Sequence, residues 1–106
     1  MAEKMLHVTM PDNSVWAVPA RLVAQDRAKY YAKKDTGTNS GEEYDKVYRE
    51  EFDFTMEDED ELTDWAADNM NWEDVSAEAV QVAGPTRPDF QEGWVNGEKK
   101  VVDPSK

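Results

Sequence analysis

The densest group of chemically capable side chains lies between Glu50 and Glu61, where eight of twelve residues are acidic and none is basic. Clustered carboxylates can bind calcium, and two carboxyls in different environments can act as general acid and base. A helix–loop–helix calcium loop needs a glycine at its sixth position. Loops counted from Asp53 or Asp58 lack that glycine, and the sequence singles out no buried carboxylate pair. We therefore expect solvated carboxylates, with no metal and no cofactor.

Other catalytic groups are scarce in this chain. His7 is its only histidine, and we expect that side chain at the surface or at a subunit contact. There is no cysteine, no nucleophile-elbow serine and no glycine-rich phosphate loop. The sequence thus predicts a protein that is not an enzyme and has no catalytic residues.

The net charge of −12 is concentrated in the middle of the chain. Residues 1–34 carry six basic and three acidic side chains, whereas residues 35–92 carry three and nineteen. Such a charge repels nucleic acids and anionic lipids at long range, and its simplest role is to keep the protein soluble. The apolar runs are too short to span a bilayer, and the N-terminus has no signal-peptide pattern. We expect one cytosolic domain with no membrane contact.

Aromatic residues next to basic ones could still form a local platform for RNA or single-stranded DNA, because bases stack on aromatic rings. The candidate residues for this role are Arg27, Lys29, Tyr30, Tyr31, Lys33, Lys34, Trp94, Lys99 and Lys100. The alternative is that the tryptophans fill the core, which we expect for Trp16, Trp65 and Trp72, while Trp94 could lie in either place.

The acidic segment supports a different hypothesis, in which it docks on a basic host or virion protein. The residues that would carry this interaction are Glu57, Asp58, Glu59, Asp60 and Glu61.

The hydrophobic pattern begins with a hairpin over residues 5–18, because apolar residues alternate on both sides of a turn sequence. A helix follows from Pro19 to Lys33-Lys34, and residues 35–39 should form a loop. Ser40 and Glu43 fit a capping box that begins a second helix.

The hydrophobic pattern in the second half of the chain is less regular. Residues 52–56 alternate like a short extended segment, and a third helix should cover residues 58–70. A strand is expected over 77–83, and Asn96-Gly97 predicts a tight hairpin between Trp94-Val95 and Val101-Val102. The expected fold is α+β, with one antiparallel sheet and the helices on one side.

Two stretches of the chain resemble a known family. The run Met-Leu-His-Val-Thr-Met-Pro-Asp at 5–12 and the run Asp-Trp-Ala-Ala-Asp-Asn-Met-Asn-Trp-Glu-Asp-Val at 64–75 are similar to small Sm-like proteins from ocean metagenomes that are attributed to marine cyanophages. The resemblance implies a small, strongly bent antiparallel sheet (an Sm-like barrel), ring-shaped homo-oligomers and a nucleic-acid role. It also implies a location in the cytoplasm of the infected host cell or in the virion.

The chain departs from ordinary Sm proteins in its order of elements. A hairpin comes first where they begin with a helix, and neither of their RNA-contacting loop motifs is found, so no binding residue carries over. We expect a single Sm-like domain over residues 1–106, made of the 5–18 hairpin, a helical insertion at 19–70 and strands within 77–102. It would serve as a non-enzymatic phage accessory protein.

Overall fold

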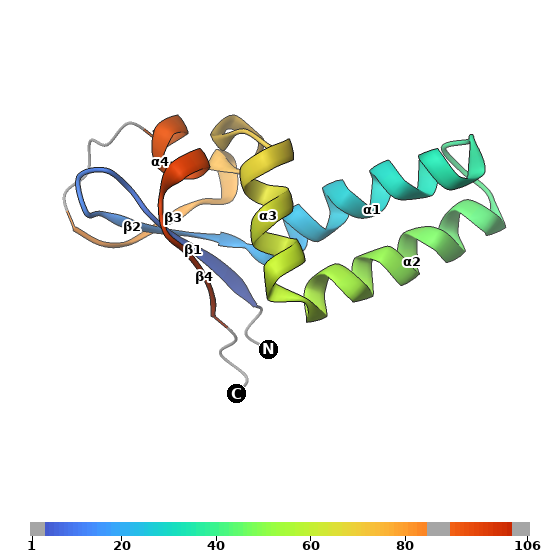
Figure 1. The fold of residues 1–106 in the computed structure, drawn as a ribbon, viewed down its shortest axis with the longest axis horizontal. Coiled ribbons are helices and arrows are strands. Elements are labelled where there is room, and N and C mark those ends of the chain that lie inside the picture. Colours follow the sequence, from blue (N-terminus) through green and yellow to red (C-terminus); the bar gives the residue numbers. More distant parts are fainter. Residues whose placement is uncertain (1–3, 85–89, 103–106) are drawn as a thin grey trace.

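The computed structural model describes residues 4–84 and 90–102, which form a four-stranded sheet and a projecting pair of helices (Figure 1). The strands are β1 (Met5–Thr9), β2 (Val15–Pro19), β3 (Val80–Ala83) and β4 (Lys99–Val102). The helices are α1 (Ala20–Thr36), α2 (Glu42–Glu57), α3 (Glu59–Asn69) and α4 (Phe90–Asn96), and two short 3-10 turns, η1 (Trp72–Asp74) and η2 (Ser76–Glu78), follow α3.

The N-terminal hairpin has the register that its apolar alternation predicts. β1 and β2 pair antiparallel, with Leu6 opposite Val18 and Val8 opposite Trp16. Leu6, Val8 and Val18 are fully buried, because side chains of a strand alternate between its two faces and these share the inner one. The predicted hairpin is confirmed.

Parts of α1, α3 and α4 cover the inner face of this sheet, whereas α2 and the outer part of α1 project away from it (Figure 1). The apolar residues that α1, α3 and α4 contribute to the core pack against the strands. The core consists of Leu6, Val8, Met10, Val18, Ala20, Val23, Ala24, Leu62, Ala66, Met70, Val75 and Trp94.

The strands run in the order β3-β2-β1-β4, and every neighbouring pair is antiparallel. β3 and β4 are therefore the two edges, and the sheet does not close on itself. The α+β class and the antiparallel sheet are confirmed, whereas the Sm-like barrel is not.

The predicted hairpin around Asn96-Gly97 is wrong. Residues 90–96 form α4, and β4 pairs with β1 instead of with Trp94-Val95. Trp94 explains the difference, because its side chain is 0% exposed and its indole Nε1 donates a hydrogen bond to the Met70 carbonyl oxygen at 3.0 Å. Burial of this large ring outweighs the local turn preference of the Asn-Gly pair. The strands expected within 77–102 are thus β3 and β4, separated by a helix.

Two smaller expectations are also corrected. Residues 76–78 form a 3-10 turn, so the strand expected at 77–83 begins only at Val80. α2 is continuous through the segment expected to be extended, and it begins after Gly41 without a side-chain cap, so Ser40 and Glu43 do not form a capping box.

α1 and α2 lie side by side as an antiparallel pair that projects away from the sheet, and we call this pair the helical arm (Figure 1). α1 ends at Gly37, whose φ of 70° is the left-handed conformation that glycine adopts easily. The arm contributes to the elongated dimensions of 46 × 29 × 22 Å.

Arg27 ties the arm together from inside. Its guanidinium donates to Glu51 Oε2 at 2.7 Å and to Thr55 Oγ1 at 3.1 Å, and it lies 3.6 Å from Glu61 Oε2. The Thr55 hydroxyl in turn donates to the Glu51 carbonyl at 2.7 Å. One buried cation therefore joins α1, α2 and α3.

Candidate interaction surfaces of the helical arm

The turn between α2 and α3 forms an acidic surface that we call the acidic corner. Phe54, Glu57, Asp58, Glu59 and Asp60 line a cleft of about 430 Å³ there. Phe54 is 45% exposed, and its ring centroid lies 5.1 Å from the guanidinium carbon of Arg27. The cleft thus presents one apolar ring among four carboxylates.

Asp58 has a structural role within this corner. It is the N-cap of α3, and its Oδ1 accepts a hydrogen bond from the Glu61 backbone N–H at 3.1 Å. The first turn of α3 also holds Glu59, Asp60 and Glu61, where negative charge stabilises the positive end of the helix dipole. Glu61 faces Arg27, so only part of the predicted acidic segment is free to meet a partner.

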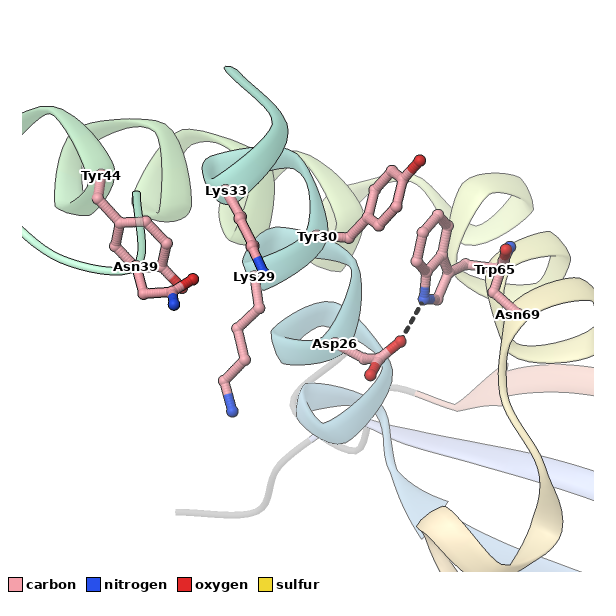
Figure 2. A pocket seen from close by; sticks show the side chains of 8 residues that line it. All are labelled: Asp26, Lys29, Tyr30, Lys33, Asn39, Tyr44, Trp65 and Asn69. Carbon is pink, nitrogen blue, oxygen red and sulfur yellow. Dashed lines mark hydrogen bonds between the residues drawn. The ribbon is translucent and has the colours of Figure 1, made fainter. Parts of the chain in front are cut away.

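The second surface is a cleft of about 540 Å³ beside α1, which we call the lysine–aromatic cleft. Figure 2 shows its lysines between two aromatic sides, with Tyr44 on α2 at one side and Tyr30 and Trp65 at the other. The lining residues are Asp26, Lys29, Tyr30, Lys33, Asn39, Tyr44, Trp65 and Asn69.

The aromatic wall of this cleft is a packed cluster. The Tyr30 and Trp65 ring centroids lie 5.4 Å apart, and Tyr31 contacts both rings at 5.1 and 5.8 Å. The Trp65 indole Nε1 donates to Asp26 Oδ2 at 2.9 Å, which fixes the ring against α1 (Figure 2). Tyr30 nevertheless remains 52% exposed.

Acidic residues lie on the far side of the same rings. Tyr30, Tyr31 and Trp65 also line a neighbouring cleft of about 330 Å³ whose remaining residues are Glu61, Asp64, Asp68 and Asn69. The aromatic cluster therefore separates a lysine side from a carboxylate side, and a polyanion lying across it would meet both.

The residues proposed for nucleic-acid binding are only partly brought together. Lys29, Tyr30, Tyr31, Lys33 and Lys34 share α1, and the Lys34 ammonium lies 5.9 Å from both tyrosine ring centroids. The sequence did not identify Tyr44, Asn39 or Asn69 as part of a site. Tyr44 and Asn69 come from α2 and α3, which only the fold brings beside α1, and Asn39 lies in the loop after α1.

The other four proposed residues lie elsewhere. Arg27 is buried in its ion pair, and Trp94 fills the core. Lys99 and Lys100 belong to β4, at the sheet edge. Lys99 donates to the Gly97 and Val95 carbonyl oxygens at 3.1 and 3.4 Å. Burial lowers the pKa of Lys99 below its usual range, and the nearby Asp68 carboxylate only partly opposes this.

The three arm-associated helices differ sharply in charge. α2 and α3 together contain twelve acidic and two basic residues, whereas α1 contains five basic and two acidic ones. The tertiary fold thus sets a cationic helix against two anionic ones.

The remaining chemical candidates can be placed on the described part of the chain. His7 lies on β1 between Ala17 of β2 and Lys100 of β4. Within residues 4–84 and 90–102, no three histidine, aspartate or glutamate side chains are grouped so that they could hold a metal ion. No helix in these ranges has the length and apolar character needed to cross a membrane.

Comparisons with protein-family models, with curated proteins and with solved structures found no match.

Proposed function

We propose that this protein is a non-enzymatic interaction module whose acidic corner docks on a basic surface of another protein. In the setting that the family resemblance implies, the partner is a basic host or virion protein. The single observation that carries the proposal is the exposed Phe54 ring, which lies in a cleft among four carboxylates.

This arrangement has the features of a binding hot spot. Interfaces are commonly anchored by a few aromatic side chains, and surrounding polar groups exclude water and select the partner. Here Phe54 would enter an apolar pocket while Glu57, Glu59 and Asp60 pair with lysines or arginines around it. The excess of acidic residues on α2 and α3 would also accelerate association with a cationic partner.

Binding of RNA or single-stranded DNA is the second candidate. Lys29, Lys33 and the exposed Tyr30 ring support it, because they share one cleft. The carboxylates beyond Trp65 and the net charge of −12 repel a polyanion, so they favour a basic protein over nucleic acid as the partner. The Sm-like barrel and ring assembly stay predictions of the resemblance, and the open edges β3 and β4 are where such a ring would form.

The leading proposal is tested with a corner variant that combines Phe54→Ala, Glu57→Gln, Glu59→Gln and Asp60→Asn. Asp58 and Glu61 stay unchanged, because they cap α3 and face Arg27. Immobilised wild-type protein should retain a basic partner from the source extract, identified by mass spectrometry. The purified partner should bind the corner variant at least about tenfold more weakly, since losing a hot-spot residue costs about 2 kcal/mol or more.

A matched control removes the same number of charges elsewhere on α2. Glu42, Glu43 and Glu50 line a separate cleft, so Glu42→Gln, Glu43→Gln and Glu50→Gln should leave partner affinity within a factor of about two. Equal weakening in both variants would mean that the partner senses only net charge. That result would count against a specific corner site.

Nucleic-acid binding is tested by titrating a fluorescent single-stranded RNA or DNA 12-mer at low salt. Retention that falls steeply with salt and is lost on Lys29→Gln with Lys33→Gln would support the second candidate. The absence of retention even at low salt would remove it.

A further inference from the structure

The acidic corner and the lysine–aromatic cleft are complementary in both charge and chemistry. The corner presents the exposed Phe54 ring among carboxylates, and the cleft presents Lys29 and Lys33 between aromatic rings. We propose that the acidic corner of one copy docks in the lysine–aromatic cleft of a second copy, so that this chain self-associates head to tail.

The charges on the cleft are available for such a contact. Lys29 and Lys33 are exposed and one helical turn apart on α1, so their ammonium groups share a face (Figure 2). The carboxylate of Asp26 accepts the Trp65 indole hydrogen bond. Two lysines against this single carboxylate leave the lining of the cleft with a net positive charge, which Glu59 and Asp60 of the incoming corner would meet.

Net repulsion between two copies does not prevent this contact. The Debye length is about 8 Å at physiological ionic strength, so charges far from the interface are largely screened. Charges in direct contact are screened much less, and there the lysines of one copy face the carboxylates of the other. Local complementarity can thus exceed the repulsion of two −12 molecules.

The aromatic groups supply the apolar part of the contact. Phe54 of the corner would lie against Tyr30 and Trp65, or against Tyr44 across the cleft (Figure 2). An aromatic pair contributes beyond its buried area when the rings are offset or edge-on. The cleft holds about 540 Å³, which is sufficient for one such side chain and its flanking carboxylates.

The contact must form between copies. The two clefts share no lining residue, and both are built on helices held together by Arg27. A head-to-tail contact leaves each pair with one unused corner and one unused cleft. Further copies can therefore add until the chain closes into a ring or grows as a filament. This mode of assembly does not use the strand edges. It rests on the proposed function, because it requires the acidic corner to be an interface.

Two variants separate the two surfaces. The cleft variant carries Lys29→Glu and Lys33→Glu, and the corner variant is the one defined above. By sedimentation velocity near 0.15 M salt, the wild-type mass should rise with concentration, and each variant alone should self-associate at least about tenfold more weakly. An equimolar mixture should form a heterodimer and stop there, because only one intact corner and one intact cleft remain.

Controls keep the result interpretable. The variant of Glu42, Glu43 and Glu50 should self-associate like the wild type, and circular dichroism should show native helix content in every variant. If the cleft variant does not fold, Lys29→Gln with Lys33→Gln at these exposed positions serves in its place. The cleft variant should still bind the basic partner of the proposed function, so failure of one proposal is distinct from failure of the other.

Three outcomes would overturn the inference. Wild-type protein could remain monomeric up to its solubility limit. It could associate while both variants associate equally well, which would place the interface elsewhere, such as at the strand edges. It could also remain monomeric and bind short RNA through Lys29 and Lys33, in which case the cleft takes nucleic acid instead of a second copy.

Discussion

The sheet and the helical arm are held together in different ways. The sheet with α4 is stabilised by apolar burial, centred on Leu6, Val8 and Trp94. The arm is stabilised by the Arg27 ion pair and by a row of stacked rings, in which Tyr44, Tyr48 and Phe52 follow one another at centroid distances of 6.2 Å.

This difference separates stability from recognition. Apolar burial involves no titrating group and no ion pair that salt could screen, so the sheet can act as the fixed part of the molecule. The arm leaves Tyr30 and Phe54 about half exposed, and each ring also packs within the molecule, Tyr30 on Trp65 and Phe54 on Arg27. Both candidate surfaces lie on the arm and on α3, which suggests that the arm can change its partner specificity without loss of the fold.

Removing Trp94 should have the largest effect on stability. Trp94→Ala would leave a cavity under α4 and an unpaired Met70 carbonyl, so the free energy of unfolding should fall by about 3–5 kcal/mol. Urea denaturation followed by circular dichroism measures the change. Its neighbour Val95 is 40% exposed, and Val95→Ala should cost less than about 0.5 kcal/mol.

A small loss in Trp94→Ala would contradict the view that this ring anchors the sheet. Near-equal losses in the two variants would do so as well.

Replacing Arg27 should destabilise the arm selectively. Arg27→Met keeps an apolar stem but leaves Glu51 and Thr55 without their cationic donor, at a cost of about 1–3 kcal/mol. The cost is below that of a fully buried ion pair because Glu51 is partly exposed to water. Hydrogen exchange should then accelerate in α1 and α2 before it accelerates in β1 and β2. Uniform acceleration over both regions would show that they unfold as one unit.

Removing the cap of α3 should have a smaller and local effect. Asp58→Ala loses the hydrogen bond to the Glu61 N–H and should cost about 1 kcal/mol in urea denaturation. Asp58→Asn keeps an acceptor oxygen at the cap and should recover most of that loss. If alanine and asparagine were equivalent, the charge of Asp58 rather than its cap would be what α3 requires.

The sequence predicted the parts of the fold that depend on local pattern. The 5–18 hairpin and the third helix, expected over residues 58–70, follow from the spacing of their apolar residues. α4 could not be predicted in this way, because the burial of Trp94 decides against an Asn-Gly turn. The open sheet likewise depends on strand pairing that no local pattern encodes.

The candidate site shows the same division. The lysines and tyrosines of α1 were found because they are neighbours in sequence. Tyr44 and Asn69 were missed because only the packing of α2 and α3 beside α1 makes them part of the cleft. Arg27 was assigned to a surface because its ion pair with Glu51 spans 24 residues and has no local signature.

The smallest expected effect concerns a cation in the sheet. Burial lowers the pKa of the Lys99 ammonium below its usual value. Between this lowered pKa and the ordinary value of 10.5, the unfolded chain binds a proton that the folded chain lacks, so stability should rise with pH. The rise should stay below about 1 kcal/mol, because Lys99 is only half-buried and water screens its charge. In urea denaturation, the free energy of unfolding of wild type relative to Lys99→Met should be larger at pH 9.5 than at pH 7.5, since the methionine variant has no proton to lose at this position. A difference between the two proteins that stays constant across this range would mean that the lysine is equally solvated in both states.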